Sequence, residues 1–177
     1  MILFTDLENY LKRLATGLTL ISHTEEAPRF ATLDIDDILS LGKSELDTNF
    51  PVMIMENPEG EMGFKHDRLY DGNYCAFHIL QQVDRGNPAT KREVMDRCKE
   101  IGTKVLLLIE KDRQKRFKGT DPAPPRFVGY FDLDQVKYQK IGPIFSSCYG
   151  WRFEFEIGQE TPISYILDEE EWIEPEA

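Results

Sequence analysis

Hydrophobic residues along this chain recur with two different periods, which predict helices in some segments and strands in others. Behind the Thr5-Asp6 pair, apolar side chains recur every three or four positions, so we expect a helix over residues 5–17. The same spacing predicts a longer helix over about residues 90–115. Its apolar segment 105–109 leaves a separate buried strand as an alternative.

The clearest strand is Tyr149–Ile157, where apolar and charged residues alternate strictly, as in a half-buried antiparallel strand. Further strands are expected at residues 18–23, 50–56, 73–83 and 136–141. Turns are expected at Asn57–Gly60, Asp71-Gly72 and Gly142-Pro143, and residues 30–48 fit either a short helix from Asp36 or a loop. The pattern predicts an α+β fold, in which two helices pack against a mostly antiparallel sheet of four to five strands.

Length and composition change this picture little. A chain of 177 residues, 41% apolar and 11% aromatic, is long enough for one core, so we expect a single domain over residues 1–167. The acidic C-terminal tail, residues 168–177, is expected to be flexible. The longest purely apolar run has five residues, and no basic leader opens the chain. With Cys75, Cys98 and Cys148 far apart, we expect a cytoplasmic protein with reduced thiols and no membrane association.

The charge adds more, because it is unevenly distributed. A net charge of −11 makes binding of duplex nucleic acid an unlikely main task. The last ten residues hold six acids and no base, whereas Arg85–Lys118 holds eleven bases and five acids. These features fit a solvated helix face and a frayed tail, or surfaces through which copies meet head to tail in a ring. The candidate contact residues are Arg113, Lys115, Arg116, Lys118, Glu169, Glu170, Glu171 and Trp172.

The basic end of the second helix leaves contact with DNA or with an acidic protein surface open. Phe117 stands among its lysines and arginines, as aromatic residues do in single-stranded nucleic-acid grooves. Cations that stabilise the negative end of a helix dipole are the simpler explanation.

Residue types that carry chemistry are present, but no complete catalytic signature is visible. Asp34, Asp36 and Asp37 could bind a divalent cation, yet they lack the pattern of a calcium loop and fit helix caps better. Glu154 and Glu156 share a strand face, as in some nucleases, but Gly158 stands where the usual lysine would follow. The remaining candidates, His66-Asp67, His78, the three cysteines and Gly42-Lys43-Ser44, fit structural roles better. We assign no catalytic, cofactor-binding or metal residue and expect no cofactor.

In their order, the predicted elements resemble the tail terminator, or head–tail completion, proteins of tailed bacteriophages and related contractile assemblies. The resemblance spans residues 6–157, and its residue-level matches are the Phe50-Pro51 entry to a strand and the closing aromatic strand 149–156. It implies an α+β sheet backed by helices, a hexameric ring that caps the tail tube, and no catalytic residues. The acidic extension and a longer region 110–148 depart from the family pattern.

The function expected from this resemblance is that of a structural subunit. It would terminate or join the tail tube of a phage or prophage as a ring, with tail-tube or connector proteins as partners, in the host cytoplasm or the virion. Two alternatives stay open. One is a small metal-dependent hydrolase or nuclease, which requires Asp34, Asp36, Glu154 or Glu156 to converge with a histidine in one pocket. The other is an acidic adaptor or immunity-type protein.

Overall fold

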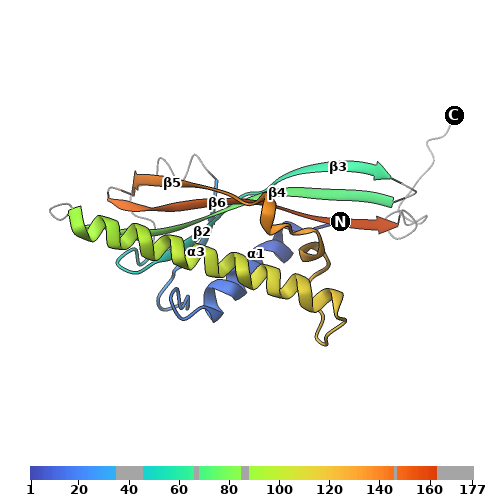
Figure 1. Ribbon diagram of the computed structural model, residues 1–177, viewed down its shortest axis with the longest axis horizontal. Coiled ribbons are helices and arrows are strands. Elements are labelled where there is room, and N and C mark those ends of the chain that lie inside the picture. The colour runs from blue at the N-terminus through green and yellow to red at the C-terminus, as the bar shows by residue number, and fades with distance from the viewer. Residues whose placement is uncertain (35–45, 66–67, 85–87, 146, 163–177) are drawn as a thin grey trace, which may run out of the picture.

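Two α-helices cover one face of a six-stranded sheet in the computed structural model, which describes residues 1–34, 46–65, 68–84, 88–145 and 147–162 (Figure 1). The elements in chain order are α1 (Phe4–Gly17), β1 (Phe30–Leu33), β2 (Val52–Glu56), β3 (Glu59–Lys65), β4 (Arg68–Gln82), α3 (Pro88–Phe117), the 3₁₀ turns η1 (Arg126–Tyr130) and η2 (Leu133–Gln135), β5 (Lys137–Ile144) and β6 (Cys148–Pro162). None of the helices in these ranges is long and apolar enough to cross a membrane. The predicted α+β class is confirmed.

The sheet is organised around two long central strands. Strands β4 and β6 pair antiparallel along their whole length, from Arg68 opposite Pro162 to Gln82 opposite Cys148. The strand order is β1-β2-β4-β6-β5, and β1 runs parallel to β2 while the other pairs are antiparallel. Strand β3 pairs with the remaining half of β4, so the sheet continues as an arm of three strands that reaches beyond the helices (Figure 1).

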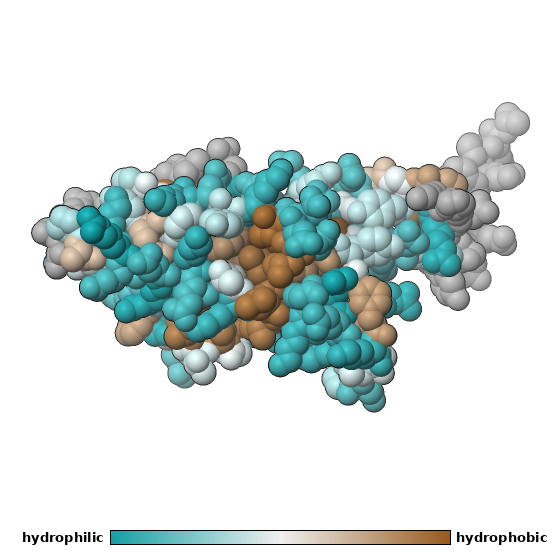
Figure 2. Space-filling model, viewed as in Figure 1, coloured by the Kyte–Doolittle hydropathy of each residue, from teal (hydrophilic) through white to brown (hydrophobic). Residues whose placement is uncertain are grey.

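Strand alternation gives the sheet a helix-side face and an outer face. On the helix-side face, Phe77 stacks on Phe153 with ring centroids 5.1 Å apart, and both are fully buried beneath the helices. Trp151 joins sheet to helix, since its Nε1 donates to the carbonyl oxygen of Met95 on α3 (2.8 Å). Figure 2 shows hydrophobic residues gathered over the middle of α3 and hydrophilic residues over both its ends.

A smaller apolar cluster lies on the outer face. Its members come from β2, β4, the end of β5 and the start of β6: Val52, Ile54, Leu80, Ile144, Phe145 and Cys148. In the part of the sheet that the helices cover, both faces therefore bury side chains. This explains why β2 is apolar without alternation.

The two helices were predicted closely, but some strand assignments were wrong. Helix α3 continues through residues 105–109, which excludes the separate strand considered there. The Asp71-Gly72 pair lies inside β4 rather than in a turn, and the Gly142-Pro143 pair lies in β5. Strands β1 and β3 were not predicted, so the sheet has six strands instead of four to five.

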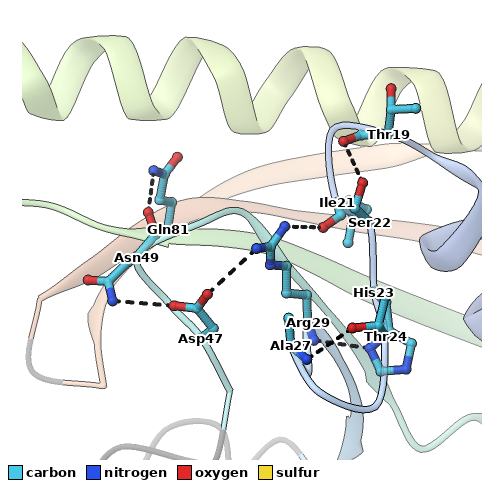
Figure 3. A network of polar contacts seen from close by, with 10 residues as sticks. All are labelled: Thr19, Ile21, Ser22, His23, Thr24, Ala27, Arg29, Asp47, Asn49 and Gln81. Carbon is cyan, nitrogen blue, oxygen red and sulfur yellow. Dashed lines mark hydrogen bonds and ion pairs between the residues drawn. The ribbon is translucent and has the colours of Figure 1, made fainter.

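The strand expected at residues 18–23 is also wrong, because this segment forms turns at the end of α1. The backbone N–H groups of Ile21 and Ser22 both donate to the carbonyl oxygen of Leu18 (2.8 Å each). Arg29 holds the segment from the other side: Nη1 donates to the Ile21 carbonyl (2.9 Å), and its backbone N–H donates to Nδ1 of His23 (3.1 Å) (Figure 3). These bonds use backbone groups that a strand would need for its ladder.

Candidate functional site

A polar cavity of about 630 Å³ opens on the outer face, where β2 leads into β3. Its walls come from β2, β4, β5 and β6 and from the segment after β1. The lining carries five carboxylates, two cations and several uncharged side chains: Asp34, Glu56, Glu59, Glu154, Glu156, Lys137, Arg152, Tyr74, Ala76 and Gln135 among others.

Glu56 is the most buried carboxylate of this cavity. Arg152 donates to it twice, from Nε to Oε1 (2.5 Å) and from Nη2 to Oε2 (2.7 Å). Nε2 of His78, which is fully buried, also lies 2.5 Å from Oε1. An ionised carboxylate only accepts hydrogen bonds, so Nε2 of His78 carries the proton. Arg152 makes a further ion pair with Glu154 beside it on the same strand face.

Charge compensation decides the protonation state of Glu56. Burial by itself disfavours the charged carboxylate, but the hydrogen bonds from Arg152 and His78 outweigh it and lower the pKa of Glu56 to about 2. The same contact with Glu56 raises the pKa of Arg152. Glu56 is thus an ionised carboxylate, and its hydrogen bonds to His78 and Arg152 join β2, β4 and β6 on the outer face.

The rest of the cavity is acidic. Arg152 is committed to Glu56 and Glu154, which leaves Lys137 as the other cation facing Asp34, Glu59 and Glu156. The carboxylates of Glu61 and Glu156 raise the pKa of the Tyr74 hydroxyl at the rim. Cys75 is no nucleophile here, because burial raises the pKa of its thiol to about 12. The cavity is suited to a cationic group.

The sequence-based candidates for metal chemistry are partly brought together. Asp34, Glu154 and Glu156 line the one cavity, and His78 reaches it through Glu56. Among the residues that the structure describes, no three histidine, cysteine or carboxylate side chains are placed to hold a metal ion. Asp36, Asp37, His66-Asp67 and Gly42-Lys43-Ser44 lie outside the described residues.

Sequence reasoning missed the two residues at the centre of the site. Glu56 closes an apolar run and Arg152 occupies a polar position of an alternating strand, and neither was singled out as a site residue. They are 96 residues apart in the chain, and only the register of β2, β4 and β6 brings them together. The signal that could have been used is an acid at the end of a strand predicted to be buried. A buried charge needs a hydrogen-bonded or charged partner elsewhere in the chain.

The basic helix end, predicted as a contact surface, is largely engaged within the subunit. Arg113 forms two hydrogen bonds with Glu110 (2.7 and 3.1 Å). Lys115 binds Asp112 (3.0 Å), and Arg116 donates to the carbonyl oxygen of Pro124 (3.0 Å). The other predicted contact residues, Glu169, Glu170, Glu171 and Trp172, lie outside the described residues, as does the rest of the tail 168–177.

The arm presents a different exposed surface. Met62 and Phe64 on β3 are 68% and 64% exposed, and both lie on the helix-side face. Strand β3 makes its extensive contacts only with β4, and no described strand pairs with its outward edge. A flat edge strand with exposed large apolar side chains is a surface on which another chain can pair.

Neither the comparison with protein-family models nor that with curated proteins found a match for this chain. Proposals about its function therefore depend on its own geometry.

Proposed function

We propose that this chain is a structural assembly protein that forms a ring with copies of itself and terminates or joins the tail tube of a phage or prophage. Its partners would be tail-tube or connector proteins, and its place the host cytoplasm during assembly and then the tail particle. The observation that carries the proposal is the arm, on which β3 leaves Met62 and Phe64 uncovered.

Uncovered apolar strands are costly for a protein that works as a monomer. Soluble monomers protect their edge strands with prolines, inward-pointing charges or a covering element. Strand β3, with the sequence EGEMGFK, has no proline, and its two large apolar side chains lie on one face. Contact with another subunit would remove this surface from water, and burial of such side chains supplies about 1.5–3 kcal/mol each.

The shape of the subunit supports a ring over a closed dimer. The arm leaves the sheet at one end, whereas β5 forms the opposite edge at the other end (Figure 1). Two different surfaces on one subunit give head-to-tail contacts, which close into rings when the rotation between subunits allows it. The order of the elements, with its Phe-Pro strand and closing aromatic strand, is the further support for the tail terminator class.

Light scattering coupled to chromatography, followed by electron microscopy, tests the proposal. We expect a concentration-dependent oligomer with a ring-shaped projection, and capture of the ring at the ends of tubes polymerised from a phage tail-tube protein. A chain that stays monomeric at every concentration, and binds no tube ends, would contradict the proposal.

A second candidate function, a metal-dependent hydrolase, is favoured by one observation. Asp34, Glu154 and Glu156 line the same cavity, although no three such side chains among the described residues are placed to hold a metal ion. Titration calorimetry with Mn²⁺ and with Mg²⁺ tests it, because oxygen-rich sites bind both ions. Binding that is lost in a Glu154→Gln/Glu156→Gln variant would favour this candidate, and absence of binding would remove it.

A further inference from the structure

We infer that strand β3 of one copy pairs with strand β5 of the next copy, so that the sheets of neighbouring subunits join edge to edge. The inference rests on the proposed self-assembly and names the two surfaces that meet.

Both strands are edges of the sheet within the described residues. Strand β3 is bonded only to β4 and strand β5 only to β6, and no described backbone group bonds to the outward side of either. The regular part of β5, Lys137–Ile141, contains no proline, and neither does β3. At about 3.3 Å per residue, these five residues of β5 span about 16 Å. The seven residues of β3 are long enough to pair with all five of them.

The helix-side faces of the two edges match in polarity. Met62 and Phe64 lie on this face of β3 and are mostly exposed. Tyr138 lies on the same face of β5, opposite Phe153, and is 52% exposed. When one sheet continues into the next, helix-side faces adjoin, so the apolar side chains of β3 meet the ring of Tyr138. Aromatic and apolar pairs across strands are among those that stabilise sheets.

On the outer face, two acids of β3 and one base of β5 have opposite charges. Glu59 and Glu61 of β3 point to this side, as their partners Tyr74 and Gly72 on β4 indicate. Lys137 points to the same side of β5, since it pairs with Glu154 and lines the outer cavity. Pairing of β3 with β5 therefore brings acids against a base, and opposite charges across strands are favourable.

Two lysines reinforce the positive character of the β5 edge. Nζ of Lys99, from α3, lies 4.7 Å from the ring centroid of Tyr138 and 3.4 Å from its hydroxyl oxygen. Nζ of Lys140 lies 5.7 Å from the ring of Trp151. If two β5 edges met, the lysines of both copies would lie close together. If two β3 edges met, Glu59 and Glu61 of both copies would lie close together. Like charges disfavour both symmetric arrangements and select the head-to-tail one.

Charge exchange between the two edges tests the inference. We expect Glu61→Lys and Lys137→Glu, each alone, to weaken self-association by about ten-fold or more. The double variant, in which the two charges are exchanged, is expected to regain most of the affinity. Glu25→Lys, on an exposed loop outside both strands, makes the same change in net charge as Glu61→Lys and serves as its matched control. Circular dichroism verifies that every variant folds.

Hydrogen exchange identifies the strands directly. In the wild-type oligomer, amides on the outward sides of β3 and β5 are expected to be protected, and dilution to monomers is expected to expose them. If the wild type forms rings but the double variant does not recover, or the two strands stay unprotected, the inference is wrong while the proposed function stands. Protection of β3 that persists in the monomer means that the same chain covers this edge, which also overturns it. A wild type that never associates overturns both proposals.

Discussion

Arg152 on β6 holds Glu56 on β2 through two hydrogen bonds, although β4 lies between the two strands. His78, on the intervening strand, donates to the same carboxylate. The three side chains form a polar row across the outer face, and each comes from a different strand of the sheet. This row joins β2 to β6 on the outer face, beside the apolar cluster in which Val52 and Ile54 lie with residues from the end of β5 and the start of β6.

Replacing Arg152 by methionine tests how much this row stabilises the fold. Removal of Arg152 leaves Glu56 buried with only the hydrogen bond from His78, so we expect Arg152→Met to lower the free energy of unfolding by about 3 kcal/mol. The control is Arg68→Met, because the ion pair of Arg68 with Glu160 is long (3.6 Å) and exposed. We expect the control to change stability by less than about 1 kcal/mol. Equal losses in urea denaturation of the two variants would contradict a structural role for the buried pair.

The pH dependence of stability follows from the same contact. The pKa of Glu56 is lowered from 4.5 to about 2 in the folded protein, so the unfolded chain binds the proton more readily. The stabilisation from Glu56 is therefore fully present above its unfolded pKa of about 4.5, and is lost as the pH falls towards 2.

Comparing the wild type with Glu56→Gln isolates this contribution from those of other carboxylates. We expect the wild type to be the more stable of the two at about pH 6, by on the order of 3 kcal/mol. The difference is expected to shrink steadily between about pH 4.5 and pH 2. Urea midpoints measured across this range provide the test, and a difference that stays constant with pH would show that folding does not shift the pKa of Glu56.

The elements that the sequence predicted well are those whose pattern is decided locally. Both helices carry an apolar stripe against the same core, and Tyr149–Ile157 alternates because one face meets the helices and the other meets polar groups. The row of Glu56, His78 and Arg152 could not be predicted in this way. It exists only through the pairing register of three strands that are far apart in the chain.

The error at Asp71-Gly72 has a physical cause in tertiary packing. Gly72 lies opposite Gly158 across the β4–β6 pair, and the ring of Tyr70 covers both. A Cβ atom at Gly72 would lie 2.7 Å from that ring, so glycine at this position makes room for Tyr70 and does not mark a turn. The neighbouring Asp71 is buried, where it accepts a hydrogen bond from the backbone N–H of Ile2. An Asp-Gly pair in a turn and an Asp-Gly pair in a packed strand therefore cannot be distinguished by their residue types alone.

The cysteines are expected to be inert in the folded protein. Cys75, Cys98 and Cys148 are all buried and none of them forms a disulfide bond, as the sequence predicted for structural thiols. Burial raises the pKa of both Cys75 and Cys98 to about 12, and the thiolate is the reactive form. We expect no rapid reaction with a thiol reagent at neutral pH, and complete reaction of all three in denaturant. A fast-reacting thiol in the native protein would mean that one of these sites opens to solvent.

A close approach of helix α3 to the sheet makes one small substitution damaging. Helix α3 crosses the sheet with Gly102 against the ring of Phe153, and a Cβ atom at this position would overlap that ring. Phe153 cannot yield, because it is stacked on Phe77 within the buried core. We therefore expect Gly102→Ala to lower the free energy of unfolding by about 2 kcal/mol or more, although alanine is the better helix former.

Gly17 supplies the matched control for this substitution. It ends α1, and a Cβ atom there would meet nothing within 4 Å. With no steric cost, Gly17→Ala is expected to leave stability unchanged or to raise it by up to about 1 kcal/mol, since it reduces the conformational entropy of the unfolded chain. Thermal and urea denaturation of the two variants should therefore shift in opposite directions or by very different amounts. Similar shifts in both would mean that α3 moves away from the sheet easily, and that the stack of Phe77 and Phe153 does not fix its position.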